Sequence, residues 1–185
     1  GSHENGDVFF QHREACNSVY DALPEVVRKY MAKINVKLGT NYDLFNYYGA
    51  ADADRVIVAM GSVTQTVKEV VDYLTAQGRK VGCLTVHLYR PFAPEYMFKV
   101  LPATVKRIAV LDRTKEPGAT GEPLYLDVKD SFYGKENAPV IVGGRYGLGS
   151  KDTTPTQIVA VFNNLDAKEP KNSFTIGIVD DVTNL

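Results

Sequence analysis

The sequence has few of the residues that would tie the protein to a disulfide framework, a metal or a membrane. Among its 185 residues there are two cysteines, Cys16 and Cys83, and no tryptophan. The cysteines form no metal-ligand pattern and each lies among apolar residues, so we interpret both as small buried side chains. A chain without disulfides is typical of a reducing, cytoplasmic compartment. No apolar run reaches the roughly 18 residues of a membrane-spanning helix, which predicts that the protein has no membrane partner.

An excess of charge of one sign is also missing. The chain has 21 basic and 22 acidic residues and a formal net charge of −1. A general nucleic-acid surface needs a clear basic excess, so this balance argues against a nucleic-acid partner. The short signatures of chemistry are absent too: the sequence contains no G-x-S-x-G elbow, H-x-x-x-H pair, C-x-x-C pair, P-loop or three-glycine dinucleotide fingerprint. We therefore name no catalytic, cofactor-binding or metal-binding residue.

A few polar positions still invite a chemical interpretation. Gly61 and Ser62 open an expected helix and could offer backbone N–H groups to an anion, although a tight turn is the favoured interpretation. His87 ends one expected strand and Asp112 follows another, but no nucleophile can be named beside either residue. An independent hydrolase is therefore the least favoured function.

The chain is expected to divide into three parts. Residues 1–3 resemble the remnant of an expression tag, and no initiator methionine precedes them, so we expect an excised piece of a longer protein. Residues 4–40 carry two apolar helical stripes separated at Pro24, which predicts an N-terminal helical arm. Residues 41–185 are expected to form one α/β domain.

In that domain, apolar β-branched runs alternate with amphipathic stretches. This alternation predicts a three-layer α/β/α sandwich with a mostly parallel five-stranded sheet and one antiparallel edge strand. The edge strand is expected at residues 42–49, because only a short link joins it to the next strand. Ser62 with Gln65, and Thr154 with Gln157, have the spacing of capping boxes at helix starts. The other strands are expected at 55–59, 80–87, 105–111, 139–142 and 173–181, with further helices beginning at Pro94 and Pro123.

Charged loops follow the carboxyl ends of these strands, where open α/β sheets meet ligands and partners. The loops are "HLYRPF", "LDRTKEPGATGEP" and "VGGRYGLGSKDTTP". Their mixed signs favour contact with another protein surface over a single ligand. We therefore predict interdomain docking by six residues, and expect alanine at Arg113 or Arg145 to weaken domain assembly rather than this fold. The six are Arg90, Arg113, Lys115, Glu116, Arg145 and Lys151.

Several segments closely resemble, in order, the second domain of the homodimeric pyruvate:ferredoxin (or flavodoxin) oxidoreductases, a domain similar to the C-terminal domain of transketolase. They are "YYGAADADRVIVAMGSVTQTVKEVVDYL", "KVGCLTVHLYRPF", "IAVLDRTKEPGATGEPLYLDV", "VGGRYGLGSKDTTPTQIVAVF" and "FTIGIVDDVT". The resemblance covers nearly everything from Phe9 onward.

The resemblance implies that the full chain converts pyruvate and coenzyme A to acetyl-CoA and CO₂. It further implies thiamine diphosphate, Mg²⁺ and 4Fe–4S clusters, with electrons passing to ferredoxin or flavodoxin. In that family these cofactors belong mainly to other domains, and this sequence lacks cluster-type cysteine spacing. The expected role is thus a non-catalytic docking domain, inactive alone, whose partners are the other domains and the homodimer mate.

One alternative of a different class stays open. A free-standing module could bind a phosphate, coenzyme A or another anionic ligand at an edge formed by Gly61, Arg90, Arg113 and Arg145. Binding measurements on the isolated chain would separate this function from docking.

Overall fold

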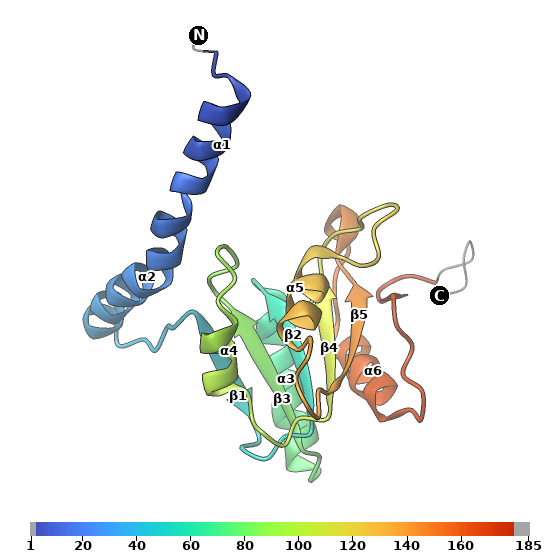
Figure 1. The fold of residues 1–185 in the computed structure, drawn as a ribbon. Coiled ribbons are helices and arrows are strands. Elements are labelled where there is room, and N and C mark those ends of the chain that lie inside the picture. Colours follow the sequence, from blue (N-terminus) through green and yellow to red (C-terminus); the bar gives the residue numbers. More distant parts are fainter. Residues whose placement is uncertain (1–2, 180–185) are drawn as a thin grey trace.

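The computed structural model describes residues 3–179 and shows helices on both faces of a six-stranded sheet, with a helical arm projecting from it (Figure 1). The strand order is β1-β3-β2-β4-β5-β6. The elements are α1 (Gly6–Ala15), α2 (Asn17–Leu38), β1 (Phe45–Gly49), β2 (Arg55–Met60), α3 (Val63–Ala76), β3 (Val81–Val86), α4 (Pro94–Val100), β4 (Arg107–Asp112), α5 (Pro123–Ser131), β5 (Val140–Arg145), the 3-10 turn η1 (Leu148–Ser150), α6 (Pro155–Asp166) and β6 (Phe174–Thr175).

The sheet confirms the predicted α/β class. All strand pairs are parallel except that of β1 with β3. β1 is the antiparallel edge strand, but its neighbour is β3 and not the strand that follows it in sequence. The two strands approach closely at Gly82, where an added Cβ would lie 2.1 Å from the hydroxyl of Tyr47. A glycine is therefore needed for the Tyr47 ring to cover this strand.

Successive side chains of the central strands belong alternately to two apolar cores. Ile57 and Ala59 belong to the core under α3 and α6, whereas Val56 and Val58 belong to the core under α4 and α5. This alternation is the period of two expected of a strand buried on both faces. Helices thus cover both faces of the sheet, and the carboxyl ends of the parallel strands gather along one edge.

Three local expectations in this domain are wrong. Ser62 has helical dihedral angles and makes no side-chain capping bond, so the predicted capping box does not form. β5 extends to Arg145, which places that residue in a strand and not in a loop. β6 contains only Phe174 and Thr175, and the end of the strand expected at 173–181 lies outside the described residues.

The arm also differs from expectation. The helices meet at Cys16, while Pro24 lies inside α2. Proline removes one helical hydrogen bond, yet Pro24 lies inside α2 and is buried there. Cys16 is half-exposed at the junction and not buried, whereas Cys83 is buried as predicted; both are free thiols.

Two absences apply to residues 3–179. No helix there is long and apolar enough to cross a membrane. The same part of the chain holds no group of three or more histidine, cysteine or acidic side chains that could bind a metal.

Candidate docking site at the carboxyl edge of the sheet

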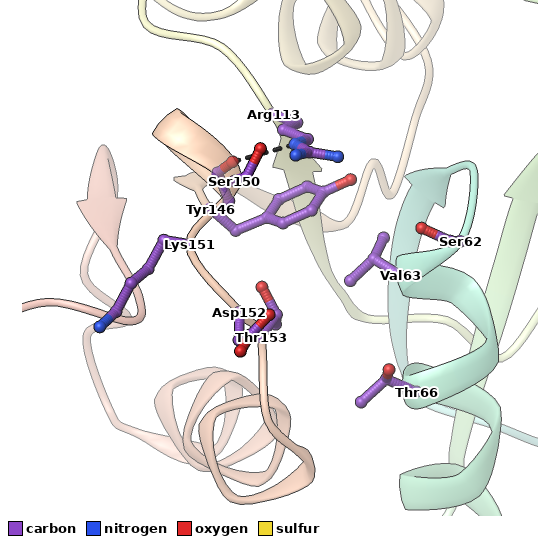
Figure 2. Close-up of a pocket in the computed structure, with 10 residues that line it drawn as sticks. Ser62, Val63, Thr66, Arg113, Tyr146, Ser150, Lys151, Asp152 and Thr153 are labelled. Carbon is purple, nitrogen blue, oxygen red and sulfur yellow. Dashed lines mark hydrogen bonds between the residues drawn. The ribbon is translucent and has the colours of Figure 1, made fainter.

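A cavity of about 250 Å³ lies at the carboxyl edge, between the start of α3 and the loop after β5 (Figure 2). Arg113 enters it from the loop that follows β4. The other lining residues are Ser62, Val63, Thr66, Tyr146, Gly147, Ser150, Lys151, Asp152 and Thr153. Only two of the six predicted docking residues, Arg113 and Lys151, share this cavity.

The Arg113 side chain is held by the loop after β5. Its Nε donates a hydrogen bond of 2.9 Å to the carbonyl oxygen of Gly147. Gly147 has φ of 65°, and an added Cβ would lie 3.2 Å from Arg113 Nε, so glycine allows this close packing. Beside it, the buried ring of Tyr146 aims its hydroxyl toward α3, and burial raises the pKa of that hydroxyl.

The two cations of the cavity do not converge. Figure 2 shows the Lys151 side chain extending away from Arg113, with the side chain of Asp152 nearby. A site for a diphosphate requires several donors aimed at one point. The arrangement instead presents separate charges of both signs on an exposed rim.

Arg145 occupies a different environment, inside the domain. Its side chain is only 5% exposed, and Glu122, whose side chain is 4% exposed, lies 3.6 Å away as its ion-pair partner. The Arg145 guanidinium also donates hydrogen bonds to the Ser173 hydroxyl at 2.9 Å and the Ser173 carbonyl at 2.8 Å. Arg145 therefore ties β5 to the segment before β6 and to the start of α5.

Asp112, at the end of β4, caps α5 from a distance in sequence. Its two carboxylate oxygens accept hydrogen bonds of 3.0 Å from the backbone N–H groups of Leu124 and Tyr125. Glu122 is the residue before α5 but makes no side-chain capping bond. Sequence reasoning treated Asp112 as a possible partner of a base and missed this role. The available signal was Pro123 at the first helical position without a capping side chain before it.

The remaining docking candidates lie on the surface. Lys115 is half-exposed with its Nζ 3.9 Å from Glu122, and Glu116 is exposed beside Thr114. Arg90 lies apart from the cavity: it pairs with Asp127 at 2.7 Å and stacks on the ring of Tyr89. The six candidates thus divide among the cavity, the buried ion pair and a separate patch near α5.

We expect the Asp112 carboxyl to titrate above its ordinary value of 3.8, because burial raises its pKa more than the two N–H bonds lower it. A raised folded-state pKa contributes stability that is complete below pH 3.8 and is lost as the pH rises through the folded-state value. The stability of the protein relative to Asp112→Asn should therefore fall as the pH rises. Urea unfolding of both proteins at several pH values measures this relative stability. A stability of the parent that rises with pH relative to Asp112→Asn would contradict the prediction.

Comparison with known proteins shows the family of this chain. The family model described as "Pyruvate:ferredoxin oxidoreductase core domain II" matches residues 53–158, more than half of the chain. The chain belongs to this family. The resemblance in the sequence is therefore confirmed, and the core domain II match includes the cavity, the Asp112 cap and the Glu122–Arg145 pair.

Curated relatives are similar over nearly the whole chain, the arm included. A pyruvate-flavodoxin oxidoreductase of Enterobacter agglomerans is 60% identical over 99% of the chain, and a pyruvate:ferredoxin oxidoreductase of Moorella thermoacetica is 53% identical over 100%. The chain spans 16% of the length of each. A solved 2-oxoglutarate:ferredoxin oxidoreductase of Magnetococcus marinus, with 2-oxoglutarate, coenzyme A and succinyl-CoA bound, aligns at a TM-score of 0.48 and 22% identity, covering 77% of this chain and 23% of its own.

Proposed function

We propose that this chain is a non-catalytic docking domain of a full-length pyruvate:ferredoxin or pyruvate:flavodoxin oxidoreductase. The observation that carries the proposal is the carboxyl edge itself. Its most buried charges, Asp112, Glu122 and Arg145, all contact groups of this same domain. Groups engaged in this way maintain the fold, and the exposed charges around them are left for another protein surface.

The full-length chain would convert pyruvate and coenzyme A to acetyl-CoA and CO₂ and pass electrons to ferredoxin or flavodoxin. The names of the curated relatives support this reaction. Thiamine diphosphate, Mg²⁺ and 4Fe–4S clusters would lie in other parts of the polypeptide. The cavity does not fit a diphosphate group, because Lys151 extends away from Arg113, so we assign no residue of this chain to these cofactors.

The docking residues are the exposed members of the predicted set. Arg113 and Lys151 would contact a neighbouring domain or the dimer mate from the rim of the cavity, and Lys115 and Glu116 from the loop before α5. Arg90 would extend this surface near Asp127. Arg145 acts indirectly, because it holds Glu122 beside Lys115. The fragment alone would be inactive, and the full enzyme would work in the cytoplasm.

We expect Arg113→Ala in the full-length enzyme to lower activity by weakening domain assembly while leaving this fold intact. Truncating one partner of a desolvated interface charge pair costs about 2–5 kcal/mol. In the isolated fragment the same exposed substitution should change the free energy of unfolding by no more than about 0.5–1 kcal/mol. Turnover and subunit assembly of full-length Arg113→Ala and Lys151→Ala, with urea unfolding of the fragments, measure both effects.

Lys106→Ala provides the matched control, because this exposed lysine precedes β4 at the opposite edge of the sheet. Full activity and normal assembly of both rim variants would remove Arg113 and Lys151 from the docking surface. Micromolar binding of phosphate or coenzyme A by the isolated fragment, lost in Arg113→Ala, would instead favour the anion-binding alternative. Calorimetric titration of the fragment with each ligand gives that result directly.

A further inference from the structure

The arm, residues 4–40, exposes a large amount of apolar surface that the docking loops do not explain. Phe10 is 68% exposed, Val19 66% and Tyr30 61%. Scattered apolar side chains are ordinary on a protein surface, but a contiguous apolar patch marks an interaction site. Further exposed apolar residues of the arm are Val8, Phe9, Tyr20, Val26, Ile34, Val36 and Leu38.

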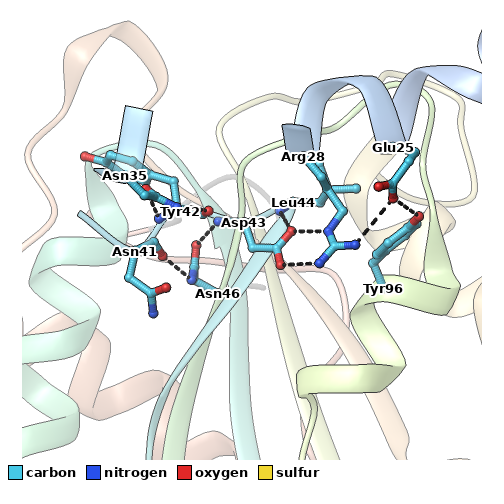
Figure 3. Close-up of polar contacts among 9 residues, drawn as sticks. All are labelled: Glu25, Arg28, Asn35, Asn41, Tyr42, Asp43, Leu44, Asn46 and Tyr96. Carbon is cyan, nitrogen blue, oxygen red and sulfur yellow. Dashed lines mark hydrogen bonds and ion pairs between the residues drawn. The ribbon is translucent and has the colours of Figure 1, made fainter. Parts of the chain in front are cut away.

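The middle of the arm is fixed on the domain, so this exposure does not come from a loose segment. Arg28 binds Asp43 with two nitrogens, at 2.9 Å and 3.3 Å (Figure 3). Burial alone would raise the pKa of Asp43, but the hydrogen bond from Arg28 lowers it below its ordinary value. Tyr96 of α4 lies under the Arg28 guanidinium, 5.1 Å from ring centre to carbon. Val27 and Met31 pack against the core under α4.

A second face of α2 remains exposed beside this anchored face. Val27 and Met31, four residues apart on one helical face, pack against the core of the domain. The buried Pro24 lies one step earlier on the same face. Tyr30 and Ile34, one helical turn apart, lie on the neighbouring face and are 61% and 44% exposed. An apolar hollow of about 510 Å³ opens there, lined by Tyr30, Lys33, Ile34, Val36 and Lys37.

The charges around this hollow define the chemistry of a partner. Residues 26–38 contain four basic side chains and no acidic one. Arg28 is engaged with Asp43, which leaves three lysines spaced four residues apart along one side of α2. A complementary surface would have apolar side chains at its centre and acidic residues at its rim. The three lysines are Lys29, Lys33 and Lys37.

We propose that this apolar and basic face of α2 binds a part of the full-length polypeptide outside residues 1–185, through apolar side chains bordered by aspartate and glutamate. The inference rests on the proposed function. The curated relatives align with the arm as well as the domain, and 16% of their length accounts for all of this chain. A segment of the same polypeptide competes at a high effective concentration, which favours it over a second copy.

The test is hydrogen exchange and side-chain oxidation of residues 26–38 in the isolated fragment and in the full-length enzyme. We expect the amides of this segment to exchange roughly tenfold more slowly in the full-length enzyme, the signature of about 1.4 kcal/mol of added protection. Oxidation of Tyr30 should fall in parallel. The double variant Tyr30→Glu/Ile34→Glu should bring the amide exchange rates of the segment back to those of the fragment.

A second variant, which removes charge, keeps the proposal testable if Tyr30→Glu/Ile34→Glu fails to fold. Lys33→Ala/Lys37→Ala changes only exposed side chains of the helix, and it should lower the protection in part while leaving the fragment folded. Tyr133→Glu, at a tyrosine that is 89% exposed after α5, is the matched control and should change nothing in the arm.

Equal exchange and oxidation in fragment and full-length enzyme would overturn the proposal. Protection already present in the fragment and rising with its concentration, with a dimer seen by light scattering, would assign the face to a second copy and also overturn it. Failure of this proposal can be told apart from failure of docking at the carboxyl edge. Tyr30→Glu/Ile34→Glu should remove the exchange protection of α2, while the Lys151 amine should keep the reactivity that it has in the unsubstituted full-length enzyme. Loss of rim docking alone would leave the arm protected.

Discussion

Replacing Arg145 by alanine is expected to destabilise the isolated fragment by about 3 kcal/mol, because removing one partner of a buried ion pair leaves the other charge uncompensated. Glu122, whose side chain is 4% exposed in the parent, would have only the half-exposed Lys115 at 3.9 Å to offset its charge. The Ser173 hydroxyl and carbonyl would lose their donors as well. The loss thus falls on this fold, contrary to the expectation from sequence that Arg145→Ala would spare it.

Urea unfolding of four fragments measures this coupling: the parent, Arg145→Ala, Glu122→Gln and the double variant. Because Glu122→Gln removes the charge that Arg145 neutralises, alanine at position 145 should be less damaging in that background. Arg113→Ala, at an exposed arginine of the same edge, is the matched control and should stay within about 0.5–1 kcal/mol of the parent. Equal losses for Arg145→Ala and Arg113→Ala would show that the buried pair does not stabilise the domain.

Gly49→Ala is the second substitution with a large expected effect, a loss of about 2–5 kcal/mol from backbone strain and overpacking together. Gly49 ends β1 with φ of 132°, a backbone angle that residues with a Cβ atom rarely adopt. An added Cβ would lie 2.5 Å from the carbonyl oxygen of Val81 and 2.7 Å from the Cα of Gly82. Both are backbone atoms of β3, so relief requires the edge strand to move.

Gly78→Ala separates the two causes. Gly78 also has positive φ, 83°, but nothing lies within 4 Å of the added Cβ, so only the strain of about 1–2 kcal/mol applies. Thermal and urea unfolding of both variants give the comparison. A Gly49→Ala fragment as stable as Gly78→Ala would mean that β1 adjusts freely against β3.

Local signals of the sequence predicted the domain well. Thr154 and Gln157 form the expected capping box at α6. Pro94 and Pro123 open α4 and α5 at their first turns. Each of these starts depends on one residue and its immediate neighbours, so the sequence alone is sufficient to find it.

The failure at Arg145 comes from contact between residues distant in the sequence, whereas the failure at Ser62 comes from local turn geometry. Ser62 has the spacing of a capping residue, but the turn at Gly61 places it in helical geometry. Pro24 does not end α2 but lies buried inside it. The sequence predicted Arg145 to lie in a loop. In the structure β5 pairs with β4 as far as Arg145, and Glu122 and Ser173 contact its guanidinium. None of these partners can be identified from spacing along the chain.

The docking role of the candidate residues stays a prediction, but the structure shows where they lie. Carboxyl-end loops do carry the exposed charges, and Arg113 and Lys151 do share a cavity. Sequence could not show that Arg90 lies elsewhere beside Asp127, or that Lys115 lies against Glu122. The exposed apolar face of the arm was interpreted from sequence only as a helical stripe, because periodicity does not tell which of two neighbouring faces the domain will cover.

The most direct test of the docking function is amine labelling of lysines in the fragment and in the full-length enzyme. Lys115 and Lys151 are exposed in the fragment and should react readily there. If the carboxyl edge docks against another domain or the dimer mate, both should be protected in the full-length enzyme, while Lys106 at the opposite edge reacts alike in both. Equal labelling of Lys115 and Lys151 in the two proteins would contradict the docking function.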